Sequence, residues 1–159
     1  MSRTVYLETS IISYLTSRVS RNLIAAARQQ LTQTWWDSRL SYDLYISEVV
    51  SRECAAGDPN AAKKRLDAIE GLGLLRTTKE AVELSKAMVA RGIIPIKAAE
   101  DSLHISIATI HAMDFLLTWN CKHIANPEIQ RQIALYLEEQ GLFLPFICTP
   151  EELLGADDE

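Results

Sequence analysis

The chain has 159 residues, 48% of them hydrophobic and 23% charged, which is typical of one folded globular domain and argues against intrinsic disorder. No apolar run approaches the roughly 20 residues that cross a bilayer, and the N-terminus has no signal-peptide pattern, so we expect a cytoplasmic protein with no membrane partner. The formal net charge of −5 argues against a large polyanion-binding surface, but it does not exclude a nucleic-acid enzyme, because acids that bind a metal also lower the net charge.

Short apolar runs rich in β-branched and aromatic residues alternate with helical patterns along the chain. The runs predict strands at residues 4–7, 44–46, 74–76, 115–118 and 146–148. Helices are predicted directly after the first strand and at residues 22–40, 47–57, 58–70, 77–92, 98–112, 126–141 and from 149 onward, with a loop at 93–97. The predicted N-caps are Ser47, Asp58, Thr77 (with Glu80 in capping-box spacing), Asn126 and Thr149.

The order of these elements predicts the fold class. Five short strands are separated by helices, and no Asn-Gly or Asp-Gly hairpin signal occurs between them. This pattern is typical of a parallel sheet that is covered on both faces. We therefore predict a single α/β domain over residues 1–159, with a central parallel sheet of about five strands flanked by helices.

Polar side chains follow several of the predicted strands. In open parallel sheets, ligands bind beyond the carboxyl ends of the strands. Glu8 follows the first strand, Glu48 and Glu53 lie on the helix after the second, Asp101 opens the helix before the fourth, and Asn120 follows the fourth. Oxygen-donor groups from four distant segments are thus expected to converge at one edge of the sheet.

Such a convergence has a chemical consequence. Carboxylates that meet repel one another unless a cation lies among them, and oxygen-only ligands favour Mg²⁺ or Mn²⁺ over zinc. A hard divalent ion can activate water and stabilise charge on a phosphodiester. The pattern therefore indicates a metal-dependent nuclease.

Each of these residues also has an ordinary structural interpretation. Glu8 can simply end a strand, Asp101 can interact with its helix dipole, and Asn120 can be a turn residue. Glu48 and Glu53 are five positions apart, about 140° around a helix, so only one of them can face the site. The other is a surface residue, and Glu48 has the spacing to pair with Arg52.

Other candidate sites receive less support from the sequence. His104 and His111 lie on the Asp101 helix without metal-ligand spacing to a cysteine, and we interpret each as a partly buried or solvated histidine. The three cysteines are widely spaced and contain no C-x-x-C pair. Trp35 and Trp36 are expected to pack the long second helix or to form a dimer face, with one of them partly exposed.

Four segments together resemble the PIN domain, and within it the VapC-type toxins of prokaryotic toxin–antitoxin pairs. The segments are Val5–Ser10, Ile46–Glu53, Asp101–Ala108 and Leu116–Asn120. The resemblance covers nearly the whole chain. It implies a Rossmann-like parallel sheet, RNA cleavage at an acidic site that binds Mg²⁺ or Mn²⁺, homodimers, and inhibition by an antitoxin protein.

The resemblance also implies roles for individual residues. The family's second acid falls on Glu53, because the serine-to-glutamate interval matches Ser47 to Glu53, and Glu48 then points away. The metal would be coordinated, directly or through water, by Glu8, Glu53 and Asp101. Asn120 would orient a metal-bound water or a phosphate. The scissile group would be assisted by Thr9, Ser10 and Thr118.

Two departures from the family pattern motivate an alternative. The first acid is usually aspartate but here is Glu8, whose extra methylene moves the carboxylate by about 1.5 Å. The acid of the T-x-D segment is here Asn120, which has no charge. A second hypothesis is therefore a catalytically attenuated PIN domain that binds RNA or a partner protein. A third, a flavodoxin-like nucleotide-binding protein, lacks the phosphate-binding loop that such ligands need.

Overall fold

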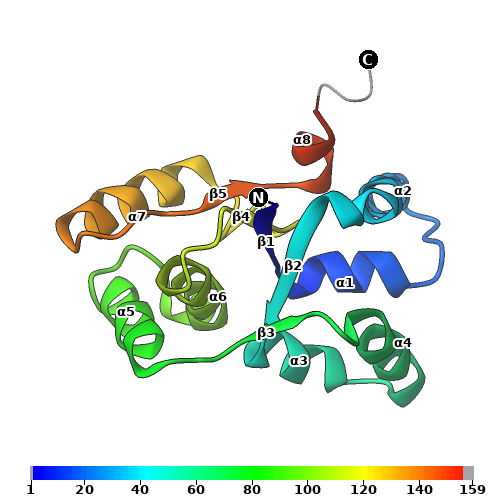
Figure 1. The fold of residues 1–159 in the computed structure, drawn as a ribbon, viewed down its shortest axis with the longest axis horizontal. Helices are drawn as coiled ribbons and strands as arrows, with labels where there is room; N and C mark the ends of the chain where they lie inside the picture. The colour runs from blue at the N-terminus through cyan, green and yellow to red at the C-terminus, as the bar shows by residue number, and fades with distance from the viewer. Residues whose placement is uncertain (1, 156–159) are drawn as a thin grey trace.

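Five short strands pair side by side, all of them parallel, in the computed structural model, which describes residues 2–155 (Figure 1). The strands are β1 (Arg3–Leu7), β2 (Tyr42–Ser47), β3 (Gly73–Leu75), β4 (Phe115–Leu117) and β5 (Phe146–Cys148). Their order in the sheet is β3-β2-β1-β4-β5. The predicted parallel sheet of five strands is confirmed. The ends of the predicted domain, residues 1 and 156–159, lie outside the described residues.

Helices connect all of these strands. They are α1 (Thr9–Thr16), α2 (Leu23–Asp37), α3 (Glu48–Ala55), α4 (Pro59–Ile69), α5 (Lys79–Ala90), α6 (Ala99–Ile110), α7 (Pro127–Glu139) and α8 (Pro150–Leu154), with the 3₁₀ turns η1 (Arg39–Ser41) and η2 (Ile96–Ala98). Among the described residues, no helix is both long enough and apolar enough to span a bilayer.

The strand order determines where the helices lie. The chain moves outward from β1 to β2 and β3, and it then returns to the other side of β1 to add β4 and β5. Because parallel crossovers are right-handed, these two directions of winding place helices on opposite faces. Figure 1 shows α1 to α4 grouped on one side of the sheet and α5 to α7 on the other. The winding direction reverses between β1 and β4, which makes the carboxyl edge there the expected ligand position.

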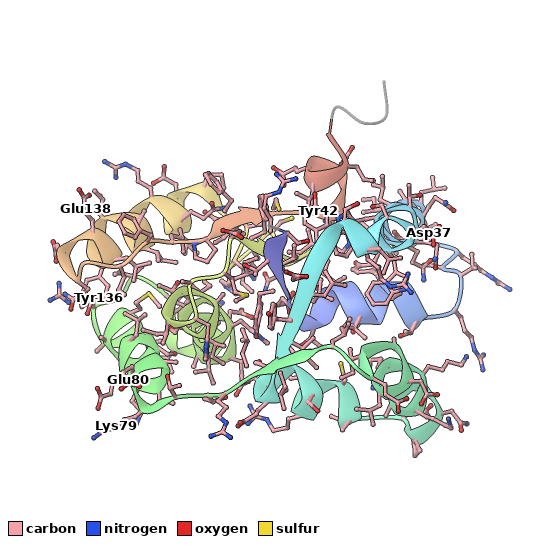
Figure 2. All side chains as sticks on the ribbon, viewed as in Figure 1. Asp37, Tyr42, Lys79, Glu80, Tyr136 and Glu138 are labelled. Atoms are coloured by element: carbon pink, nitrogen blue, oxygen red, sulfur yellow. The ribbon has the colours of Figure 1, made fainter. Side chains whose placement is uncertain are left out.

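The core is built around β1, the middle strand. Val5, Tyr6 and Leu7 are each 0% exposed, because helices cover both faces of the sheet. The outer helices carry their charges outward, as Figure 2 shows for Lys79 on α5 and Glu138 on α7. A strand buried on both faces cannot hold a charged group without partners, and this makes the residue that follows β1 informative.

Most predicted caps are confirmed, and one is wrong by a residue. Ser47, Asp58, Asn126 and Thr149 each accept a backbone N–H at the start of a helix. The cap of α5 is Thr78, whose side chain accepts the N–H of Ala81, rather than Thr77. The predicted loop at 93–97 runs into the 3₁₀ turn η2.

The two tryptophans of α2 differ in burial, as predicted. Trp35 is 1% exposed and belongs to the core, whereas Trp36 is partly buried. Trp35 packs near Tyr42 at the start of β2, with ring centroids 6.0 Å apart. The long helix is therefore anchored to the sheet through Trp35.

Candidate active site

Glu8 lies at the point where the winding of the sheet reverses. Its backbone N–H donates to the carbonyl of Leu117, the last residue of β4, at 3.1 Å. The side chain is nearly enclosed, since the residue is only 6% exposed. Its Oε1 accepts hydrogen bonds from Ser10 at 2.5 Å and from Thr118 at 2.6 Å. The Glu8 carboxylate is thus held by hydroxyls from α1 and from the end of β4.

The orientation of these two hydroxyls is set by the backbone around them. The N–H of Trp119 donates to Ser10 Oγ at 2.8 Å, and the N–H of Asn120 donates to Thr118 Oγ1 at 2.9 Å. A hydroxyl that already accepts an N–H is free to give its own proton elsewhere. Both protons are therefore available to Glu8, and together they satisfy Oε1 of this nearly buried carboxylate.

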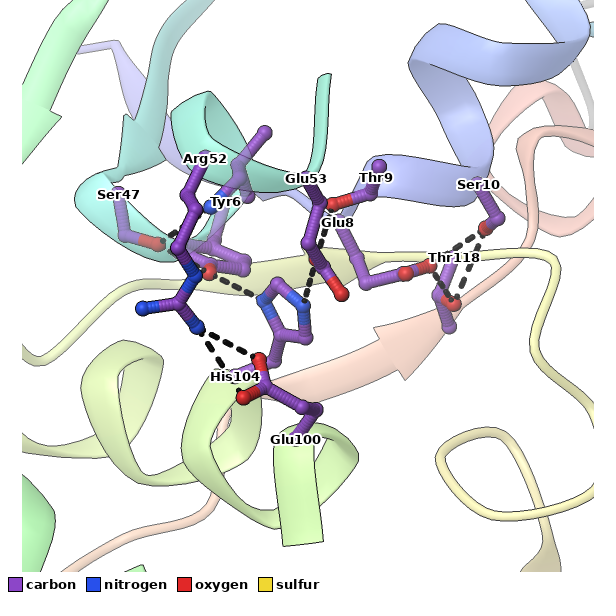
Figure 3. A network of polar contacts seen from close by, with 11 residues as sticks. Tyr6, Glu8, Thr9, Ser10, Ser47, Arg52, Glu53, Glu100, His104 and Thr118 are labelled. Carbon is purple, nitrogen blue, oxygen red and sulfur yellow. Dashed lines mark hydrogen bonds and ion pairs between the residues drawn. The ribbon is translucent and has the colours of Figure 1, made fainter. Parts of the chain in front are cut away.

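Glu53 occupies the neighbouring position, on α3. Its Oε1 accepts from the Thr9 hydroxyl at 2.5 Å and lies 2.7 Å from Nε2 of His104 (Figure 3). The helix that carries it begins at Ser47, whose side chain accepts the N–H of Val50. Of the two glutamates on α3, Glu53 faces the site and Glu48 is exposed, as the resemblance implied.

A buried histidine connects Glu53 to Tyr6 in the middle strand. His104 is 1% exposed, and its Nδ1 lies 2.6 Å from the hydroxyl of Tyr6. The Tyr6 hydroxyl in turn lies 2.8 Å from Ser47 Oγ. The interpretation of His104 as a partly buried or solvated residue is therefore wrong, because α6 packs against the sheet with this side chain pointing inward.

The negative charges of three predicted acids act on His104, and one of these acids, Glu53, contacts it. Burial acts to lower the pKa of His104, but the hydrogen bond to Glu53 and the negative charges of Glu8, Glu53 and Asp101 outweigh burial, and the pKa is raised. For Glu53, burial acts to raise the pKa, but the hydrogen bonds from His104 and Thr9 and the nearby positive charges lower it overall. At neutral pH, Glu53 is consequently ionised.

Asp101 takes a different partner. Its Oδ2 lies 3.3 Å from Nδ1 of His123, in the turn after β4. Asn120 stabilises the same turn, since its Oδ1 accepts the N–H of His123 at 3.1 Å. Asp101 and Asn120 thus both contact His123, and Asn120 has the turn role that was the structural alternative for it.

The oxygen atoms of Glu8 and Glu53 suit a hard cation, although they do not form a complete set of protein ligands. No three His, Cys, Asp or Glu side chains in residues 2–155 form a ready-made metal-ligand group. In Glu8 and Glu53 the hydrogen bonds go to Oε1, and none of the described residues donates to Oε2. Mg²⁺ is typically held by one or two carboxylates together with several waters. Two carboxylates, each with an oxygen to spare, therefore fit such an ion.

The surface pair predicted beside the site is wrong. Arg52 does not pair with Glu48 one turn away but with Glu100 on α6, at 2.9 Å and 3.1 Å to the two carboxylate oxygens. Spacing on one helix cannot reveal a partner on another helix. The pair joins α3 to α6 beside the Glu53–His104 contact (Figure 3).

Comparison with known proteins establishes the fold. No protein-family model matches the chain, and a search of curated proteins also finds no match. One similar structure is a chain of VapBC2 from Rickettsia felis, which was solved bound to a promoter DNA fragment. The TM-score is 0.53 and the sequence identity 15%, and the match covers 92% of the present chain and 98% of the Rickettsia chain. VapC20 from Mycobacterium tuberculosis, described as a sarcin-ricin loop cleaving toxin, has a TM-score of 0.59 and 14% identity, over 77% of this chain and 95% of that chain. The chain therefore has a PIN/VapC-like fold, as its sequence predicted.

Proposed function

We propose that this protein, with its PIN/VapC-like fold, is a metal-dependent endoribonuclease that hydrolyses RNA phosphodiester bonds. The observation that carries the proposal is the pair of hydrogen-bonded carboxylates, Glu8 and Glu53, at the carboxyl edge where the winding of the sheet reverses. Burying a carboxylate, as at Glu8, costs free energy unless the group is hydrogen-bonded or paired, and such acids cluster at functional sites. The position and charge of Glu8 and Glu53, together with the fold, support a role in binding a metal ion for RNA cleavage.

Glu8 and Glu53 would hold Mg²⁺ or Mn²⁺ through their second oxygens, and Asp101 would act through a bound water. Such an ion, when present, lowers the pKa of water and stabilises charge on a phosphodiester. The chain's own hydroxyls fix the two carboxylates, Ser10 and Thr118 on Glu8 and Thr9 on Glu53. The same three hydroxyls would also assist the scissile group, as the resemblance implies.

Partners follow from the same proposal. One similar structure is a VapBC2 complex, and we propose that this chain is likewise a toxin held by an antitoxin protein. Large apolar side chains that a partner could cover are exposed at and before the start of α2, namely Val19, Leu23 and Ile24. A homodimer is a further prediction of the resemblance. We also keep the cytoplasm as its expected location.

The attenuated PIN domain is the second candidate, and one observation favours it. Asp101 is paired with His123, and Asn120 stabilises the turn, so neither contributes an unengaged charge to the site. In this case the domain would bind RNA or a protein partner without efficient cleavage. The two candidates differ in what they expect of Glu8.

Cleavage of a fluorescent single-stranded RNA by the purified chain tests the proposal, with Mn²⁺, Mg²⁺ or EDTA added. We expect cleavage with either ion and none with EDTA. Glu8→Asp is expected to reduce the cleavage rate about tenfold, because its carboxylate retracts about 1.5 Å from the hydroxyls of Ser10 and Thr118. The matched control, Glu48→Asp, removes a methylene from an exposed glutamate and should leave the rate unchanged.

The attenuated domain makes the opposite prediction in the same assay. It expects the wild-type chain to cleave little or nothing, and the double variant Glu8→Asp, Asn120→Asp to gain activity. A large gain in the double variant would overturn our interpretation of Glu8 as a residue fitted to this site. A further loss would support it.

A further inference from the structure

A continuous series of hydrogen bonds, buried except at its Glu53 end, runs from the start of α3 back to Glu53 on the same helix. It passes through Ser47, Tyr6 and His104, with contacts of 2.8 Å, 2.6 Å and 2.7 Å along the way (Figure 3). Ser47 and Tyr6 are 0% exposed. Three elements that are distant in the sequence, β1, α3 and α6, are joined by this relay, and none of its inner members is used by the proposed chemistry.

The direction of the hydrogen bond between His104 and Glu53 is determined. Glu53 is ionised and can only accept, so the atom that faces it, Nε2 of His104, carries the proton in either charge state of the ring. In the neutral ring, Nδ1 then accepts the Tyr6 hydroxyl proton. Ser47 Oγ accepts the N–H of Val50 at 3.3 Å and gives its own proton to Tyr6. With a neutral ring, Ser47, Tyr6 and His104 each donate one hydrogen bond and accept one.

This arrangement restricts the side chain of Glu53. The Glu53 side chain is 32% exposed, and a glutamate with this much exposure on a helix would otherwise sample several rotamers. The imidazole of His104 on α6 and the hydroxyl of Thr9 on α1 both hold Oε1 of Glu53. Oε2 is consequently left in one place, free of donors among the described residues, beside Glu8.

We propose that Tyr6 and His104 are positioning residues of the acid site, which hold Glu53 in the geometry that receives a divalent cation. The inference rests on the proposed function, since it concerns the same site. Groups that orient metal ligands from behind affect metal affinity or activity by 10- to 100-fold. A purely structural role would require only that the ring fill its space in the core.

Tyr6→Phe separates these two roles. His104→Ala would open a cavity in the core, whereas Tyr6→Phe keeps the buried ring and removes only the hydroxyl that holds Nδ1 of His104. The matched control is Tyr45→Phe, which removes a hydroxyl from a partly buried tyrosine on β2 outside the relay. The readouts are the ¹⁵N–¹H signal of the His104 Nε2–H by NMR, and the Kd of the chain for Mn²⁺ by calorimetry.

We expect the wild-type chain and Tyr45→Phe to show a protected Nε2–H signal and the same Kd for Mn²⁺. In Tyr6→Phe, the signal should broaden or disappear and the Kd should rise about tenfold. RNA cleavage should show a lower kcat with an unchanged KM. An unaltered Nε2–H signal and an unaltered Kd in Tyr6→Phe would overturn the inference.

The two readouts also separate this inference from the proposed function. If the wild-type chain binds Mn²⁺ but does not cleave RNA, the nuclease proposal fails. The change in the Kd for Mn²⁺ in Tyr6→Phe still shows whether Tyr6 and His104 position Glu53. If the wild-type chain binds no Mn²⁺ at all, both the nuclease proposal and the cation-positioning role are overturned, whatever the NMR signal shows about the relay.

Discussion

Glu53→Gln is expected to reduce RNA cleavage by about 100- to 1000-fold, a loss of roughly 3–4 kcal/mol of transition-state stabilisation. The amide has nearly the same shape but no negative charge, so it loses its attraction for a divalent cation. Its carbonyl oxygen can still accept from His104 and Thr9, so its N–H₂ group takes the place of Oε2, where it cannot ligate a cation. The measurement is the single-turnover rate with saturating Mn²⁺ and a fluorescent RNA.

The matched control for this change lies on the same helix. Glu48→Gln removes an equal charge from an exposed position in the first turn of α3, and the cleavage rate should stay within about twofold of wild type, as surface substitutions usually have small effects. Equal losses in the two variants would mean that net charge, rather than a site at Glu53, governs the activity. An unchanged rate in Glu53→Gln would indicate a contaminating nuclease.

Leu7→Ala is expected to destabilise the fold by about 2–5 kcal/mol, the usual cost of a Leu-to-Ala change in a well-packed core. Leu7 is 0% exposed in the middle strand, and it directly precedes Glu8. The cavity would lie between the two helical layers, where little can collapse into it. Urea unfolding at equilibrium, followed by circular dichroism, measures the change in the free energy of unfolding.

Leu74→Ala provides the comparison, with the same chemistry at an exposed position. Leu74 is 58% exposed in the edge strand β3, and its loss should change the free energy of unfolding by no more than about 0.5 kcal/mol. Similar losses in both variants would contradict the assignment of β1 as the buried centre of the sheet.

The fold was largely predictable because its signals are local. An apolar run such as residues 4–7, a cap such as Ser47, and a proline after Asn126 each act within a few residues. The parallel order then follows from the helices between the strands. The error at Thr77 has the same origin, because two adjacent threonines offer nearly the same cap and only the backbone path selects Thr78.

The site was predictable where strand ends determine it, and not where tertiary packing does. Glu8 was proposed because it follows the first strand, whereas helix geometry left Glu48 and Glu53 open and only the resemblance selected Glu53. The hydrogen bonds of His104 depend on how α6 packs against β1, and the pairing of Arg52 with Glu100 depends on how α3 lies beside α6. The sequence separations involved are long, so no local pattern encodes them.

Two spacing signals could nevertheless have pointed to the relay. Asp101 and His104 are three residues apart on α6, and therefore share one face of that helix. Tyr6 and Glu8 are two residues apart at the end of β1, where alternate side chains point the same way. A histidine and a tyrosine that share faces with two predicted acids were candidates for contact with them.

The central claim is that Glu8 and Glu53 together form a site for a hard divalent cation. Anomalous diffraction at the manganese edge, from crystals grown with MnCl₂, tests it most directly. We predict one strong peak in direct contact with the Oε2 atoms of both glutamates, which disappears in Glu53→Gln. Manganese bound only at other positions, with no peak between these two side chains, would contradict the claim.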